Sequence, residues 1–146
     1  MLAVRTGQND FELWKLDRAG ITRQALGRFP AGGSRARFSP DSRYFALSIG
    51  EVLRVWETAT AQLVFGPTPS TMIAASRTLE PFSRSGRYLG SASRANNTAA
   101  VVDLENRRLS EPIRHTGPLW AIEFSHDDNL VATASGNIVE LWDPAT

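Results

Sequence analysis

Two series of aromatic landmarks recur along the chain at a nearly constant distance, and this period constrains the fold more than any other feature. Three phenylalanines lie 44 and 42 residues apart, at Phe38, Phe82 and Phe124. The second series is spaced by 42, 46 and 40 residues and holds tryptophan in all but its third copy, at Trp14, Trp56, Val102 and Trp142. In each of the last three copies the Phe precedes the second landmark by 18 to 20 residues. A period near 40 residues indicates the repetition of one supersecondary unit.

The second copy has the clearest pattern of strands. Short apolar runs at 35–38, 44–48, 52–56 and 62–65 are separated by residues that favour turns, such as Gly, Pro, Asp and Thr. Successive strands joined by short turns form an antiparallel meander, and a meander repeated at this period is typical of propeller blades. The same pattern predicts that the first copy also forms an antiparallel group of strands.

In the first copy, the runs 2–6 and 11–17 alternate between apolar and polar residues, and residues 7–10 supply turn chemistry. Residues 21–26 are polar and rich in arginine, which is typical of the edge strand of a sheet. The third copy departs most from the pattern, because Pro81 lies in its inner strand and residues 94–98 lengthen its hairpin. Proline cannot donate to a strand ladder, so this inner strand is expected at a sheet edge.

These repeats resemble the WD40-repeat family. The resemblance is carried by the Phe-Ser-Pro-Asp turn at 38–41, by small-residue strands that end in Ser48 and Ser135, and by the Trp-Asp strand end at 142–143. The segment 114–120 is similar to the family's Gly-His segment, with arginine in place of the glycine. The resemblance spans nearly the whole chain and implies an all-β propeller of four-stranded antiparallel meander blades.

The resemblance also implies an incomplete ring within a single partial propeller. Residues 1–30 are expected to form a truncated blade, 31–66 and 67–113 two further blades, and 114–146 a blade that lacks its outer strand. About three and a half blades cannot close a ring, because propellers have 4–8 blades. We therefore expect the remaining blades to come from the parent chain or from a second copy in a homodimer, since open blade faces leave apolar surface exposed.

Composition excludes several classes of partner and site. The chain has 16 basic and 15 acidic residues, so its net charge of +1 predicts neither a nucleic-acid nor a membrane partner. It has no cysteine, which excludes disulfides and thiolate zinc sites. No run of apolar residues reaches the length of a signal peptide or a membrane span, so a cytoplasmic location is expected. Fifteen of the basic residues are arginine, which we interpret as the codon usage of a GC-rich, bacterial genome.

Six residues are expected to have structural roles, and three of these assignments, the two serines and the histidine, follow from the resemblance. The tryptophans at strand ends should fill the space between blades. In the family, a Ser or Thr on the preceding strand accepts the indole N–H and is linked to a His before the inner strand and to an Asp in the hairpin. The matching residues here are Trp14, Trp56, Trp142, Ser48, Ser135 and His115. The hairpin Asp is absent, because Gly50 and Gly136 stand near its place.

No group of residues predicts catalysis, a metal site or a cofactor. His126, Asp127 and Asp128 occupy the turn of the fourth copy, so we interpret them as a solvated turn instead of metal ligands. The sequence contains neither a Gly-x-Ser-x-Gly elbow nor a phosphate-binding Gly-x4-Gly-Lys loop. We therefore predict that the chain is not an enzyme and binds no cofactor.

Four residues are candidates for binding a partner. Trp120 lies at the entry of an inner strand, where alternation places it on the side of Ile122 and Phe124 and favours packing. The alternative is exposure at a rim where family members often bind partners, because exposed Trp is a frequent hot spot. The arginines expected near this rim could recognise acidic or phosphorylated peptides, although solvated side chains are the simpler interpretation. They are Arg35, Arg37 and Arg94.

The leading functional prediction is a scaffold that presents propeller loops to a protein or peptide partner. Two alternatives remain open. The chain could be a regulatory or sensor module of a larger bacterial signalling protein, such as a kinase or an NTPase. It could also be a small-ligand-binding propeller, which would need polar residues that converge on the channel. Fold alone does not choose between these functions.

Overall fold

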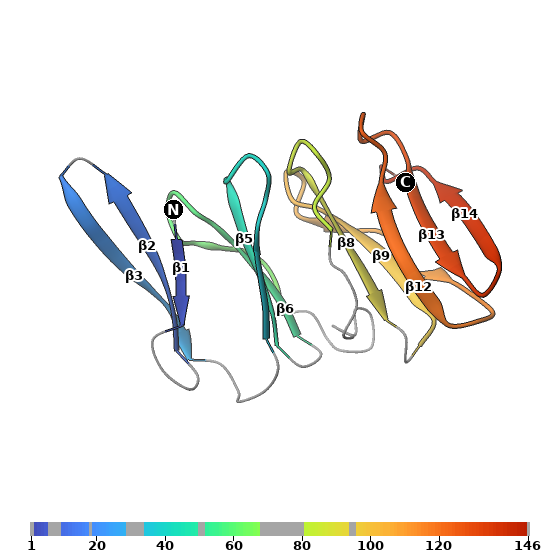
Figure 1. The fold of residues 1–146 in the computed structure, drawn as a ribbon, viewed down its shortest axis with the longest axis horizontal. Coiled ribbons are helices and arrows are strands. Elements are labelled where there is room, and N and C mark those ends of the chain that lie inside the picture. Colours follow the sequence, from blue (N-terminus) through green and yellow to red (C-terminus); the bar gives the residue numbers. More distant parts are fainter. Residues whose placement is uncertain are drawn as a thin grey trace.

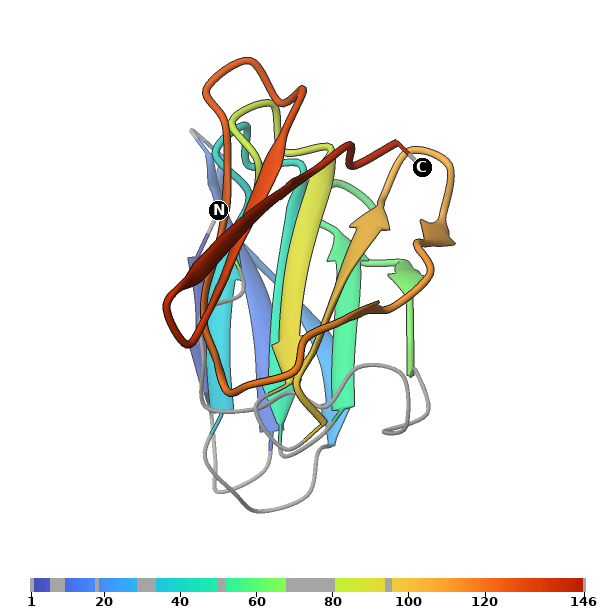
Figure 2. The ribbon, with the colours of Figure 1, turned by 90° about the vertical axis from the view of Figure 1, so that its right-hand side faces the viewer.

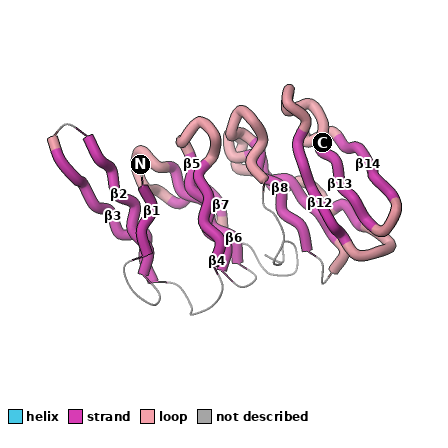
Figure 3. Tube along the Cα trace, viewed as in Figure 1, coloured by secondary structure: helices cyan, strands magenta, loops and turns pink. Residues whose placement is uncertain are grey.

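The computed structural model describes residues 2–5, 10–17, 19–28, 34–49, 52–67, 81–93 and 96–145. These residues form strands and turns and contain no helix, as Figure 3 shows by its colours. The strands belong to four antiparallel sheets of three or four strands each. The prediction of an all-β chain built from antiparallel meanders is therefore confirmed.

The first two sheets contain the strands that the first two copies predict. The first sheet has the order β1-β2-β3, with strands Leu2–Arg5, Asp10–Asp17 and Gly20–Arg28. The second sheet has the order β4-β5-β6-β7, with strands Ser34–Phe38, Tyr44–Ile49, Val52–Glu57 and Leu63–Phe65. Each strand pairs with its neighbour in sequence, which is the definition of a meander.

The third and fourth sheets continue this order. In the third sheet, β9 (Thr98–Asp103) pairs with β8 (Tyr88–Ser93) on one side and with β10 (Arg108–Leu109) and β11 (Ile113–Arg114) on the other. The fourth sheet has the order β12-β13-β14, with strands Leu119–Phe124, Val131–Ser135 and Ile138–Trp142. Most of the inner strand expected around Pro81 lies outside the described residues. Within them, Phe82 bridges Leu89 and the Pro81 carbonyl accepts a hydrogen bond from the Gly90 N–H.

The four sheets stand side by side in sequence order, from the blue first sheet to the red fourth sheet (Figure 1). In the view at right angles the sheets overlap as a stack (Figure 2). This arrangement is that of a partial propeller. The first and last sheets stand at the two ends of the row in the described part of the chain.

One turn design closes the first hairpin of the second, third and fourth sheets. In the second sheet, the Ser39 N–H donates to the Tyr44 carbonyl at 2.9 Å, and the Tyr44 N–H donates back to the Ser39 hydroxyl at 2.9 Å. The Ser39 hydroxyl in turn donates to the Asp41 carboxylate at 2.5 Å. The serines at the equivalent positions of the other two sheets accept in the same way. The fourth residue of each turn has a positive φ, and these residues are Ser42, Gly86 and Asp128.

The cores lie between sheets. The second and third sheets enclose a cluster that includes Tyr44, Leu53, Val55, Leu89 and Val102. The third and fourth sheets enclose a second cluster, in which the rings of Tyr88 and Phe124 are stacked with centroids 6.1 Å apart. Gly90 allows this second contact, since a Cβ there would lie 2.9 Å from the Ile122 side chain. Burial of apolar strand faces between neighbouring sheets is therefore what holds the row together.

Candidate functional site

The fourth sheet holds Trp142 in a hydrogen-bonded position that differs from the one predicted. The loop 136–137 joins β13 to β14, so Val131 stands opposite Trp142 and Thr133 opposite Glu140. The Trp142 indole Nε1 reaches diagonally across this ladder and donates to Thr133 Oγ1 at 2.9 Å. The acceptor is therefore Thr133 and not Ser135. Counting back from the two-residue loop would have identified it, because that loop sets the register.

His115 is buried between the third and fourth sheets and contacts a carboxylate. Its Nδ1 lies 2.8 Å from Glu140 Oε2, and its ring meets that of Trp142 edge-on with centroids 6.5 Å apart. His115 Nε2 is buried and has no hydrogen-bond partner within the described residues. Glu140 lies on β14. It therefore supplies a carboxylate to His115 in place of the hairpin Asp that the family's network has and this chain lacks.

The connector 115–118 is tied to both neighbouring hairpins. The His115 N–H donates to the Asn97 carbonyl at 2.8 Å in the third sheet. In the fourth sheet, the Ser135 hydroxyl donates to the Gly117 carbonyl at 2.8 Å and the Gly136 N–H donates to the Pro118 carbonyl at 3.3 Å. The Ser135 hydroxyl therefore bonds the connector instead of the indole. These bonds set where β12 begins.

Trp120 follows this connector and is about half exposed. The register of β12 against β13 shifts between Leu119 and Ala121, so Trp120 lies in a β-bulge. Leu119 takes the inward position on the face shared with Ile122, and Trp120 is left 52 % exposed. The expectation that alternation would pack Trp120 beside Ile122 is wrong, because the extra residue of the bulge interrupts the alternation.

The outer face of the fourth sheet is apolar and open. Val139 and Leu141 are 67 % and 64 % exposed, whereas Leu53 and Val55, at the same distances before Trp56, are fully buried against the third sheet. Leu130 is also exposed, although its counterparts Tyr44 and Tyr88 are buried. Within the described residues, this face therefore has the composition of a blade interface and no sheet covering it.

The remaining predicted site residues are placed as follows. Trp56 is buried, with its ring 6.0 Å from that of Phe45, and Ser48 is buried on β5. The Trp14 indole donates to Glu12 Oε2 at 2.7 Å within its own strand. Arg37 is exposed on β4. The side chain of Arg35 and the whole of Arg94 lie outside the described residues, so their proximity to Trp120 stays a prediction.

Asp128 links the turns of two sheets. Its carboxylate accepts hydrogen bonds from the Ser83 hydroxyl at 3.0 Å, the Arg84 N–H at 2.8 Å and the Ser85 N–H at 2.9 Å. Burial raises the pKa of Asp128, but these hydrogen bonds outweigh burial and hold the pKa below its usual value. Ser85 occupies the position of the turn aspartates Asp41 and Asp127, so the neighbouring sheet supplies the carboxylate that this turn lacks.

His126 and Asp127, which precede Asp128 in the same turn, make different contacts. Asp127 stays within its own turn, where it accepts from the Ser125 hydroxyl at 2.6 Å and from the Asn129 N–H at 3.2 Å. His126 Nδ1 lies 3.0 Å from the Arg84 guanidinium. The interpretation of 126–128 as a solvated turn therefore omitted its contact with the third sheet.

A chain of ion pairs links the second and third sheets next to these turns. Arg87 donates to Asp103 at 2.6 Å and lies 3.5 Å from Glu105, which in turn lies 3.5 Å from Arg43. Burial would raise the pKa of Asp103, but hydrogen bonds from Arg87 and Asn106 prevail and lower it to about 2. Asp103 stands one residue after Val102, as Asp143 does after Trp142.

This arrangement predicts a loss of stability in acid. The pKa of Asp103 is lower in the folded chain than its ordinary value of 3.8, so its contribution is complete above about pH 4 and disappears as the pH falls towards 2. The pKa difference corresponds to about 2 kcal/mol. In urea titrations, the stability difference between the wild type and Asp103→Asn should shrink by about that amount between pH 5 and pH 2. A constant difference would contradict the assignment.

The described residues form neither a metal-binding cluster nor a membrane-spanning helix. They contain no group of three or more His, Asp or Glu side chains that could hold a metal ion. Nothing in the described part of the chain forms a helix with the length and hydrophobicity that crossing a bilayer needs. The arrangement offers exposed apolar and aromatic groups on rigid sheets, which suits binding.

Comparison with known families agrees with the strand pattern. Residues 107–143 match the family model described as WD domain, G-beta repeat. This segment is a WD40 repeat. It contains the outer segment of the third sheet and all three strands of the fourth, so the WD40 repeat spans two neighbouring sheets. A search of curated proteins finds no match to the chain.

Proposed function

We propose that the chain is a non-catalytic scaffold that binds a protein or peptide partner through one rim of its WD40 sheets. The observation that carries this proposal is the exposed side chain of Trp120, which a bulge turns outward while the connector before it is held by hydrogen bonds. Trp buried at an interface is a frequent hot spot. A rigid support reduces the entropy that binding costs, because the side chain is already positioned.

The open face of the fourth sheet supports a second part of the proposal. We infer that another blade covers Val139 and Leu141, since the same positions of the second and third sheets are buried by the next sheet. That blade comes from the parent polypeptide or from a second copy. Light scattering on the purified chain separates these sources, because only self-association doubles the mass. The bacterial origin, the cytoplasmic location and the signalling module remain predictions.

Trp120→Ala tests the scaffold proposal. We expect the substitution to lower the free energy of unfolding by about 1 kcal/mol at most, because the residue is 52 % exposed. Binding of the partner should weaken by at least tenfold, as expected for a hot spot. The partner is captured with the full-length parent protein, identified by mass spectrometry, and its affinity is then measured with both forms.

Ile21→Ala is the matched control for this experiment. Ile21 is an exposed apolar residue at 57 %, and it lies on β3 at the other end of the row. The proposal predicts that this control binds the partner as the wild type does. If the wild type and Trp120→Ala bind the partner with equal affinity, the rim around Trp120 is not part of the binding site.

A further inference from the structure

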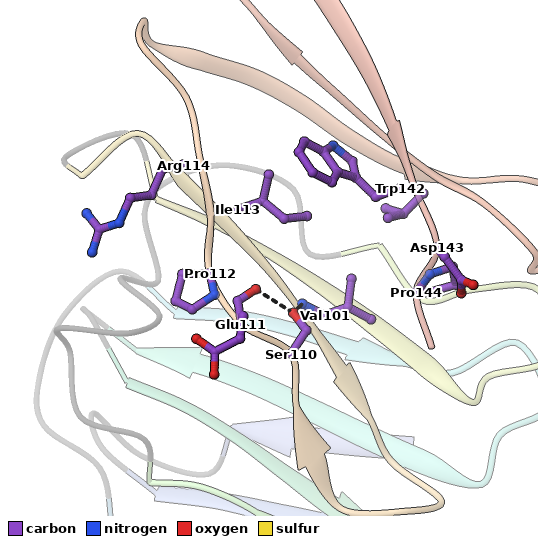
Figure 4. Close-up of a pocket in the computed structure, with 10 residues that line it drawn as sticks. Val101, Ser110, Glu111, Pro112, Ile113, Arg114, Trp142, Asp143 and Pro144 are labelled. Atoms are coloured by element: carbon purple, nitrogen blue, oxygen red, sulfur yellow. Dashed lines mark hydrogen bonds between the residues drawn. The ribbon is translucent and has the colours of Figure 1, made fainter. Parts of the chain in front are cut away.

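The junction of the third and fourth sheets holds two features that the scaffold proposal does not use. One is a cavity of about 340 Å³ between the outer segment of the third sheet and the end of β14 (Figure 4). The Ser110 hydroxyl in its wall bonds the Val101 N–H and the Glu111 carbonyl, so this group is not left for a ligand. The rest of the lining is mainly apolar and includes Pro112, Ile113, Val131, Trp142 and Pro144.

The other feature is a set of hydrogen-bond donors in the first turn of the third sheet. The Ser83 hydroxyl and the N–H groups of Arg84 and Ser85 all donate to the two carboxylate oxygens of Asp128, at 2.8 to 3.0 Å. Successive backbone N–H groups that converge in a turn form a nest, which binds anions. Ser83 is fully buried, so its hydroxyl donates from a fixed position. The turn is therefore shaped to receive both oxygens of one oxyanion.

The corresponding turn of the second sheet is built differently. Pro40 stands at the position of Arg84 and has no N–H, so the same set of donors cannot form there. Asp41 stands at the position of Ser85, and its carboxylate accepts the Arg43 N–H at 3.0 Å within its own turn. The second turn therefore carries its own carboxylate, whereas the third turn receives one from the neighbouring sheet.

The carboxylate lies in a similar place at both junctions. Gly86 in the third sheet is the counterpart of Asp128, and a Cβ at Gly86 would lie 2.5 Å from Asp41 Oδ1. The second sheet thus places its carboxylate beside a glycine of the third. At the next junction Ser85 offers no carboxylate, and Asp128 brings one from the following sheet. Each of these two junctions therefore holds one carboxylate, supplied by one side or the other.

The nest favours a negatively charged group over a neutral one. Burial alone would raise the pKa of the Asp128 carboxyl, yet its hydrogen bonds to the turn lower it. The donors therefore favour the ionised form. Arg84 adds a positive charge beside the turn, with its guanidinium 3.0 Å from His126 Nδ1. A carboxylate or a phosphate matches this combination of paired N–H donors and positive charge.

We propose that the first turn of the third sheet is an oxyanion-binding site that Asp128 occupies as a tethered ligand. A free carboxylate or phosphate group takes the site when the Asp128 side chain is absent. Because both groups use the same donors, docking of Asp128 and binding of an external oxyanion exclude each other. The inference goes beyond the scaffold function and uses no residue of the rim around Trp120.

Removal of the tethered ligand tests the site. Asp128→Gly empties the nest and keeps a residue that tolerates the positive φ, as Gly86 does in the third sheet. Melting of the full chain is followed in sodium chloride, sodium formate and sodium phosphate at equal pH and ionic strength. Relative to chloride, formate should raise the Tm of Asp128→Gly saturably, by about 3–5 °C at ten times the Kd of formate.

The wild type and Asp127→Ala are the controls, because both keep Asp128. Neither should show a saturable response to formate. Beyond the response of the controls, a larger shift with phosphate than with formate assigns the site to phosphorylated groups, and a smaller one assigns it to carboxylates. Both outcomes support an oxyanion site. Equal shifts in all three forms, or no shift in Asp128→Gly, would overturn the proposal.

Substitutions at Arg84 test the donors themselves. In the Asp128→Gly background, Arg84→Pro removes one N–H, as Pro40 does in the second turn, and should abolish the shift with formate. Arg84→Ala keeps the N–H and should retain most of the shift. A shift that survives Arg84→Pro would place the anion outside the nest, against the proposal. Melting in chloride confirms that each form is folded.

A swap of the carboxylate keeps the proposal testable if Asp128→Gly alone does not fold. Ser85→Asp gives the third turn its own carboxylate, as Asp41 does in the second. Added to Asp128→Gly, it should restore the Tm and remove the response to formate. Added to the wild type, it should lower the Tm, because two carboxylates would share one site. Equal effects of Ser85→Asp in both backgrounds would contradict a shared site.

Discussion

Replacing Trp142 by alanine is expected to lower the free energy of unfolding by about 3–4 kcal/mol. The side chain packs against the core between the third and fourth sheets, meets His115 edge-on and donates to Thr133, which is fully buried. Removal therefore opens a cavity and leaves a buried hydroxyl without its donor. Chemical denaturation followed by circular dichroism measures the change.

Two further substitutions separate the parts of this effect. Trp142→Phe keeps an aromatic ring but removes the indole donor, and should cost about 1–2 kcal/mol. Thr133→Val removes the acceptor and keeps the shape, so the double substitution with Trp142→Phe should cost less than the sum of the two single ones. Additive effects would show that the bond at 2.9 Å contributes nothing to stability.

Replacing Asp128 by alanine is expected to cost about 2–3 kcal/mol, although the residue lies in a surface turn. The substitution removes three hydrogen bonds that cross from the fourth sheet to the third, and one of their donors, Ser83, is fully buried. Denaturation at pH 7 measures the loss, and proteolysis tests whether the fourth sheet separates before the others.

Asp127→Ala is the matched control, because it removes the adjacent carboxylate of the same turn. Asp127 is exposed and the hydrogen bonds described for it stay within its own turn, so its removal should have a clearly smaller effect. Asp128→Asn should fall between the two, since it keeps one acceptor oxygen and tolerates the positive φ of this position. Equal effects of Asp127→Ala and Asp128→Ala would contradict a clamp between sheets.

The two predictions together describe how the scaffold keeps its shape. Trp142 holds the end of the fourth sheet that lines the cavity, and Asp128 holds its first turn against the third sheet. Both contacts hold in place the sheet that carries the surfaces we propose for binding. Rigid placement of these surfaces is what would allow a small set of exposed residues to bind a partner.

Local patterns in the sequence predicted most of the strands and the partial propeller. The strands of the second sheet fall within one residue of their predicted ends, because alternation and turn residues act over a few positions. The Ser-centred turns follow for the same reason, since Ser39 and Asp41 bond within one short segment.

Sequence patterns predicted the candidate site only in part. Trp120 was singled out as a candidate from the sequence, but its favoured packing beside Ile122 was wrong because a bulge changes which residues face inward. Thr133 was missed because the diagonal reach from Trp142 depends on the register of β13 and β14. The carboxylate of Glu140 was missed because a connector brings His115 back to β14.

The sequence by itself determined the period, the strands, the turns and therefore the order of the sheets, because these depend on residues that are neighbours along the chain. Only the tertiary structure decided which side chains cross from one sheet to the next, such as Asp128, and where a cavity remains beside Ile113. Those features depend on how far apart neighbouring sheets stand and how their edges align. That spacing is set by the packing of two whole faces, which no short segment of sequence specifies.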